Sequence, residues 1–135
     1  MSGFKTLRID AVDTLRDDDT GADWITLRHR LGVTAFGLNA YRAPEAGVQV
    51  IVDHDETDSG HQEVYVVLNG SASFAVGTET IDAPAGTIVF VEDPSLSRVA
   101  VATEPGTTVL AIGAEPGRIF TPSSWEAELL EGSAS

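Results

Sequence analysis

The sequence has no cysteine among its 135 residues. This absence excludes disulfide frameworks, cysteine-based zinc sites, iron–sulfur clusters and thiol catalysis together. Basic residues are also scarce, because eight Lys and Arg stand against 21 Asp and Glu, which gives a formal net charge of −13. Such a surface repels phosphate backbones and anionic lipid headgroups. We therefore expect neither nucleic acid nor a membrane surface as a partner.

Long hydrophobic runs are missing as well. No apolar stretch approaches the length of a membrane span, and the first residues lack the basic and apolar regions of a secretory signal. We therefore expect a cytoplasmic protein. A glycine-rich phosphate loop, a Gly-x-Ser-x-Gly elbow and a dinucleotide fingerprint are also absent from the sequence. The length suits one domain with a single core, and an apolar content of 42% is ordinary for a globular chain.

Three segments differ in composition. Residues 1–23 form an acidic N-terminal approach segment with six aspartates, and one short helical turn is predicted at residues 11–16. Residues 24–121 alternate apolar runs with Gly, Pro, Asp and Ser clusters, a pattern typical of short β-strands. Residues 122–135 begin with a proline and place Ser123 and Glu126 at the spacing of a capping box, which predicts a short helix over residues 124–130 and a tail.

The middle segment is predicted to be a β-barrel or sandwich. Its runs are too closely spaced for crossover helices, so the sheets should be antiparallel and the fold class all-β. The pair Asn69-Gly70 predicts a hairpin turn between two runs, because both residue types tolerate a positive φ. The predicted strands cover residues 24–31, 33–42, 48–52, 63–68, 72–76, 87–91, 98–103 and 107–112.

The run over residues 63–68 is apolar on both faces. Residues 64, 66 and 68 form one face, whereas Glu63, Tyr65 and Val67 form the other. We expect both faces to be covered, one by a second sheet and the other by the N-terminal strands or a partner subunit. Glu63 is the exception, because a buried carboxylate costs free energy unless it is paired, hydrogen-bonded or bound to a cation.

A cluster of titratable residues precedes this strand. Residues 53–63 contain two of the three histidines and five carboxylates. On an extended chain His61, Glu63 and Tyr65 project to one face, because side chains alternate with period two. His54 arrives from the preceding strand, so two imidazoles and one carboxylate can converge. That ligand set suits Fe(II), Mn(II), Ni(II) or Zn(II) and leaves coordination positions open for a substrate.

Two stretches between about residue 48 and residue 112 form a family pattern, namely Glu63-Val64-Tyr65-Val66-Val67-Leu68-Asn69-Gly70 and Pro84-Ala85-Gly86. Through them the chain resembles the small single-domain cupins, because the first stretch matches the second half of the first cupin motif and the other is the usual approach to the second. The resemblance implies an antiparallel double-stranded β-helix, the jelly-roll or cupin barrel. It also implies a divalent metal in the barrel, a small-molecule ligand and pairing of two copies as a homodimer.

Two positions depart from the cupin pattern. Glu56 stands where the first motif has its second histidine, which makes it an alternative metal ligand or a general base. Ser97 falls where the second motif has its histidine, so the family's fourth metal ligand is missing. Ser97 and Tyr65 then become candidates for the substrate pocket. Three protein ligands still suffice for a metal site with open positions.

Two functions remain open. In the first, the protein is a metal-dependent enzyme of the oxygenase, isomerase or lyase type, with His54, His61, Glu63 and Glu56 as candidate ligands. In the second, the barrel is a metal-free module that binds a small molecule or only dimerises. Residues 53–58 are then a solvated acidic loop, and Glu63 is a buried carboxylate satisfied by hydrogen bonds.

Overall fold

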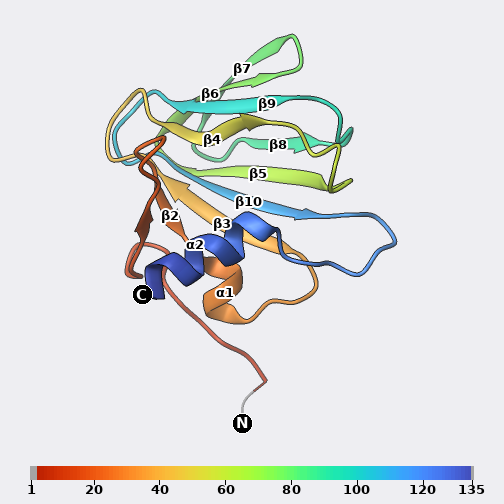
Figure 1. Cartoon of the computed structure of the whole chain (residues 1–135). Coiled ribbons are helices and arrows are strands. Elements are labelled where there is room, and N and C mark those ends of the chain that lie inside the picture. The colour runs from red at the N-terminus through yellow and green to blue at the C-terminus, as the bar shows by residue number, and fades with distance from the viewer. Residues whose placement is uncertain (1–2, 135) are drawn as a thin grey trace.

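The computed structural model describes residues 3–134, whose strands form two antiparallel sheets that face each other (Figure 1). One sheet contains, in spatial order, β1 (Leu15–Arg16), β2 (Asp23–Ile25), β3 (Gly37–Arg42), β10 (Thr108–Ala114), β5 (Gln62–Asn69) and β8 (Ile88–Val91). The other contains β4 (Gln49–His54), β9 (Arg98–Ala102), β6 (Ser71–Val76) and β7 (Glu79–Pro84). The helices are α1 (Leu27–Leu31) and α2 (Ser124–Ala134). The predicted all-β antiparallel fold with a C-terminal helix is confirmed.

The apolar core lies between the two sheets. Tyr65 and Val67 of β5 point into it, since alternate side chains of a strand take opposite faces. The Tyr65 ring contacts Phe74 of the facing sheet, with 5.8 Å between the ring centroids. The largest members of this core are Val50, Ile51, Tyr65, Val67, Phe74, Val89, Val91 and Val109. The inner face of the central strand is therefore covered as expected.

The outer face of the six-stranded sheet is covered only in part. Residues 7–12 pack on it through Leu7, Ile9 and Val12, which contact a second buried cluster that includes Ile25 and Ala40. On β5, Val64 and Val66 are half-buried, whereas Leu68 is exposed. Among the described residues the N-terminal segment therefore packs near β3 and β10 and not over β5, and cover of the β5 face by a partner subunit, the other alternative, stays a prediction.

The predicted strand over residues 24–31 is wrong beyond its first two residues. It ends at Ile25, and α1 follows. Gly32 ends that helix in the left-handed region at φ 73°, where its N–H donates to the carbonyl of Arg28. The helical turn predicted at residues 11–16 is also wrong, because Leu15 pairs with Trp24 as a short strand. Pairing with β2 overrides the local preference at residues 15–16, whereas a local helix replaces the expected strand at residues 27–31.

The turn at Asn69-Gly70 exists, but it does not close a hairpin. It connects β5 to β6, and these strands belong to different sheets. Gly70 adopts a φ of 74°, and a Cβ at this position would collide with Thr107. The hairpin lies one strand later, where β6 pairs with β7. The sequence pattern misses β7, because most of its side chains are exposed and no apolar run marks it.

The C-terminal helix starts at Ser124 as predicted and continues to Ala134, four residues beyond the predicted end. The predicted tail ends at Ser135, which lies outside the described residues. Figure 1 shows α2 lying beside β2, β3 and α1. Its Trp125 ring contacts Trp24 of β2 at 5.2 Å between centroids.

No helix in the described part of the chain is long and apolar enough to cross a bilayer.

Candidate functional site

A cavity of about 70 Å³ lies between the interior face of the six-stranded sheet and the C-terminal segment. Strands β3, β5 and β10 form its floor, and residues around α2 form its roof. A volume of this size corresponds to about two water molecules. The polar side chains that line it are Asn39, Tyr41, Glu56, His61, Glu63, Ser123 and Glu126.

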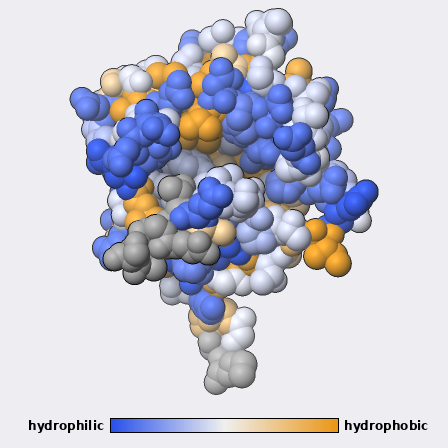
Figure 2. Space-filling model, in the orientation of Figure 1, coloured by the Kyte–Doolittle hydropathy of each residue, from blue (hydrophilic) through white to orange (hydrophobic). Residues whose placement is uncertain are grey.

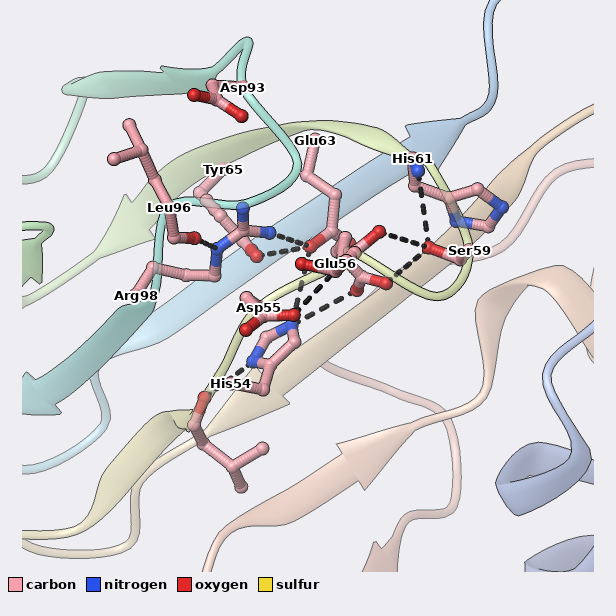
Figure 3. A network of polar contacts seen from close by, with 12 residues as sticks. His54, Asp55, Glu56, Ser59, His61, Glu63, Tyr65, Asp93, Leu96 and Arg98 are labelled. Atoms are coloured by element: carbon pink, nitrogen blue, oxygen red, sulfur yellow. Dashed lines mark hydrogen bonds and ion pairs between the residues drawn. The ribbon is translucent and has the colours of Figure 1, made fainter.

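Glu63 is the centre of a polar network at one wall of this cavity (Figure 3). Its Oε1 atom accepts a hydrogen bond from the Tyr65 hydroxyl at 2.5 Å and another from Arg98 Nη1 at 3.0 Å. The same oxygen lies 3.5 Å from Nε2 of His54. Three donors therefore converge on one carboxylate oxygen, which satisfies the buried charge without any group outside the chain.

His54 and Glu56 form the second part of the network. Nε2 of His54 lies 3.1 Å from Oε1 of Glu56, and Nδ1 lies 2.6 Å from the carbonyl oxygen of Val52. The other Glu56 oxygen accepts the Ser59 hydroxyl at 2.6 Å. Because both imidazole nitrogens face acceptors, the doubly protonated ring satisfies every contact around it.

The pKa values of this pair move in opposite directions. Burial alone lowers the pKa of His54, but hydrogen bonds with Glu56 and Glu63 outweigh it and raise the pKa to about 10. Burial alone raises the pKa of Glu56, but hydrogen bonds from His54 and Ser59 outweigh it and lower the pKa to about 2. At neutral pH an imidazolium therefore faces an ionised carboxylate.

Arg98 is the residue that the sequence interpretation missed. The motif register selects Ser97, but Ser97 is exposed and Arg98, the next residue, is 0% exposed at the start of β9. Besides its bond to Glu63, Arg98 donates from Nε to the carbonyl of Leu96 at 3.0 Å. The sequence did contain a signal for the burial of Arg98. Side chains of a strand alternate with period two, and Arg98 shares its face with the buried Ala100 and Ala102.

The structure places the other predicted residues differently. His61 lines the cavity and its ring contacts Phe120 at 5.7 Å between centroids, but it lies outside the His54–Glu56–Glu63 group. β5 begins at Gln62, so the alternation that would align His61 with Glu63 does not extend to it. Tyr65 is buried in the core and contributes its hydroxyl to Glu63 rather than a wall to the cavity.

The His54, Glu56 and Glu63 side chains are compatible with a metal ion in donor type and spacing. Their ligand atoms lie within 4.8 Å of one another. Neighbouring ligands of a tetrahedral ion lie about 3.4 Å apart when each is about 2.1 Å from the metal. The charge of the group fits less well, because Arg98 already neutralises Glu63 and a divalent ion here would lie close to a buried guanidinium.

The roof of the cavity is attached by a second buried ion pair. Arg28 Nε of α1 donates to both oxygens of Glu126 in α2, at 3.2 and 3.1 Å. Glu126 is 3% exposed, and the sequence had predicted it as a capping-box residue.

Burial, followed by the charges of Glu63, Glu126 and Glu56, raises the pKa of Tyr41. The Tyr41 hydroxyl therefore lies in the field of carboxylates from three parts of the chain.

Comparison with known proteins identifies the architecture. A cupin protein from Bacteroides fragilis superposes with a TM-score of 0.65 at 17% identity, covering 91% of this chain and 93% of that chain. A predicted oxalate decarboxylase from Thermotoga maritima gives a TM-score of 0.66 at 17% identity, with coverage of 82% and 99%. A sugar phosphate isomerase of the cupin superfamily from Silicibacter pomeroyi gives 0.68 at 16% identity, with coverage of 82% and 76%.

No protein-family model and no curated protein matches the sequence. The structural similarity, at identities under a fifth, establishes the fold class and not the chemistry. The chain is a double-stranded β-helix with a polar cavity at one wall of its barrel. It has the small single-domain cupin fold that the motif at residues 63–70 indicated.

Proposed function

We propose that the protein is a cupin-fold module that binds a small molecule in the barrel cavity without a metal ion. The observation that carries this proposal is the hydrogen-bonded ion pair between Arg98 and Glu63, with 3.0 Å between Nη1 and Oε1. Glu63 is the carboxylate that the sequence analysis expected to be paired, hydrogen-bonded or bound to a cation. A guanidinium from the chain itself supplies that charge.

The charges of the polar network balance within the chain. Arg98 and the protonated His54 carry two positive charges, and Glu56 and Glu63 carry two negative charges. A divalent ion coordinated directly by His54, Glu56 and Glu63 would place two positive charges beside the buried Arg98 guanidinium, in a partly buried site where charge interactions are strong. A concave cavity with convergent polar groups beside it is the usual form of a small-molecule site.

A second candidate is a site for a divalent ion, Fe, Mn, Ni or Zn, held by His54, Glu56 and Glu63. One specific observation favours it, because the Nδ1 atom of His54 lies 2.6 Å from a backbone carbonyl. Histidine ligands commonly donate their second ring nitrogen in this way while the first binds the metal. The oxygenase, isomerase or lyase chemistry belongs to this candidate, because it depends on the metal as a Lewis acid.

Metal reconstitution followed by elemental analysis separates the two candidates. Untagged protein is incubated with each of the four metals, desalted and analysed, beside the His54→Ala and Glu56→Gln variants. We expect far less than one equivalent of metal in all three proteins. One equivalent in the wild type, lost in both variants, would establish the metal site and overturn the proposal.

We also propose that the chain forms a homodimer through the uncovered outer face of β5 and β8. Ile88 and Phe90 of β8 are 65% and 53% exposed, and they pair with Val66 and Val64 of β5. β8 is an edge strand of its sheet. Exposed apolar side chains on a strand edge are typical of association surfaces. Sedimentation equilibrium should show a dimer for the wild type and a monomer for Phe90→Asp, and a monomeric wild type would refute the proposal.

A further inference from the structure

We infer that the cavity binds a small organic ammonium ion, with the ammonium group inside it and the carbon chain directed outward. This inference rests on the proposed function, since it assigns a ligand class to the same cavity. Its basis is the set of hydrogen-bond acceptors, aromatic rings and acidic residues that line the cavity and its approach.

The cavity wall is rich in acceptors. Three carboxylates line it, from Glu56 before β5, Glu63 on β5 and Glu126 on α2. Arg98 and Tyr65 both donate to Oε1 of Glu63. An ionised carboxylate only accepts hydrogen bonds, so a ligand group that meets these carboxylates must donate. An ammonium group is the compact donor of this kind.

Asn39 supplies an independent observation. It lies on the interior face of β3, between Gly37 and Tyr41, which also line the cavity. The residue is 8% exposed, and its Oδ1 atom is buried without a hydrogen-bond partner among the described residues. Buried amide oxygens normally have a partner, so an acceptor left open in a cavity wall indicates a donor that enters from outside the chain.

Aromatic rings complete the inner cavity. Tyr41, Phe120 and Trp125 belong to its lining, and the Trp125 ring is braced against Trp24. Cations bind over the faces of aromatic rings through the ring quadrupole, and recognition of organic ammonium groups uses this combination of rings and carboxylates. These walls favour an alkylated ammonium over a bare metal ion, which requires oxygen or nitrogen ligands on all sides.

The approach to the cavity is acidic as well. A larger hollow of about 240 Å³ shares His61, Phe120 and Ser123 with the inner cavity and is lined further by Asp58 and Glu115. Figure 2 shows many hydrophilic side chains on the surface in this view, on a protein with a formal net charge of −13. Such a field attracts cations and repels carboxylates. The outer hollow gives the carbon chain room that the inner cavity lacks.

Three isosteric probes test the ligand class. Butylammonium, butanol and butyrate are titrated in turn into ¹⁵N-labelled wild-type protein, and the Trp125 indole and Asn39 amide signals are followed by NMR. We expect butylammonium to shift both signals with at least about tenfold higher affinity than butanol, and butyrate not to bind. Equal or tighter binding of butanol or butyrate would overturn the inference and leave small-molecule binding in place.

A matched pair of variants locates the site. Asn39→Leu removes the open acceptor while it keeps the branching of the side chain, and it should weaken butylammonium binding at least about fivefold, because the ammonium loses one of its acceptors. Asn69→Leu changes an exposed asparagine whose amide donates to the carbonyl of Gly106, away from the cavity lining, and it should bind like the wild type. An unchanged affinity in Asn39→Leu, or no binding of any probe, would also overturn the inference. Stoichiometric metal in the reconstituted wild type would instead overturn the proposed function itself.

Discussion

Arg98 and Glu63 join the two sheets of the barrel, because β9 carries the guanidinium in one sheet and β5 carries the carboxylate in the other. The arginine is fully buried, and the carboxylate side chain is 14% exposed. A cation of the chain itself thus compensates the acidic residue of the cupin motif.

Arg98→Met should lower the free energy of unfolding by about 3–5 kcal/mol, because it leaves the Glu63 carboxylate buried without its counter-charge. Urea denaturation measures the loss. The double variant Glu63→Met with Arg98→Met should recover most of the stability, since an apolar pair of similar volume removes the stranded charge. A loss below about 1 kcal/mol in the single variant would show that the ion pair contributes little.

Tyr65→Phe should cost about 1 kcal/mol, the usual contribution of one hydrogen bond, because its hydroxyl donates to Glu63. Tyr41→Phe is the matched control, since the Tyr41 hydroxyl makes no hydrogen bond with the described residues. Both substitutions remove one oxygen from a ring on the same interior face. The melting temperature should therefore be lower for Tyr65→Phe than for Tyr41→Phe. Equal melting temperatures would contradict the assigned role of Tyr65.

The His54–Glu56 pair predicts a pH window of stability. The pKa of His54 is raised from 6.5 to about 10, so its contribution is complete below pH 6.5 and is lost as the pH rises toward 10. The pKa of Glu56 is lowered from 4.5 to about 2, so its contribution is complete above pH 4.5 and is lost as the pH falls toward 2. The pair should stabilise the fold most between pH 4.5 and 6.5.

Urea denaturation of the wild type and of His54→Gln at a series of pH values measures this window. The difference in the free energy of unfolding between the two proteins removes the contribution of the titratable groups that they share. That difference should be largest in the window and should shrink on the alkaline side. A difference that stays constant from neutral to alkaline pH would mean that His54 is not held in its protonated form.

Arg28→Met should loosen the C-terminal helix. Arg28 is the hydrogen-bond donor to the buried carboxylate of Glu126, and the two residues connect α1 to α2. We expect faster amide hydrogen exchange in residues 120–130 and a loss of about 3 kcal/mol in stability. Arg118→Met removes an exposed arginine whose partner Glu115 lies 3.6 Å away, and it should change neither quantity. Equal amide exchange rates in Arg28→Met and Arg118→Met would contradict the attachment of α2 through Arg28.

The sequence alone predicts the fold class well, because its information is local. Alternation along residues 63–68 correctly places Tyr65 and Val67 in the core, and Gly70 correctly marks a turn. The turn was wrongly assigned to a hairpin, because a turn that crosses between two sheets and a hairpin turn require the same positive φ. Strand β7 was missed because exposed edge strands need little apolar sequence.

The candidate site is only half visible in the sequence. His54, Glu56 and Glu63 were selected, and the structure brings them together. Arg98 was not selected, because the family motif expects a histidine one residue earlier and a lone arginine normally indicates a surface position. Its role depends on β9 facing β5, a contact between residues 35 positions apart that no local pattern encodes. The pair of Arg28 and Glu126, 98 positions apart, was missed for the same reason.

Calorimetric titration of Zn²⁺ and Mn²⁺ into metal-free wild type and Arg98→Met tests most directly whether Arg98 replaces a metal ion. We predict no stoichiometric binding to the wild type. Removal of the guanidinium leaves the His54, Glu56 and Glu63 donors without its repulsion, so Arg98→Met should bind at least about tenfold more tightly. Binding of one equivalent by the wild type, with no gain in Arg98→Met, would contradict the account.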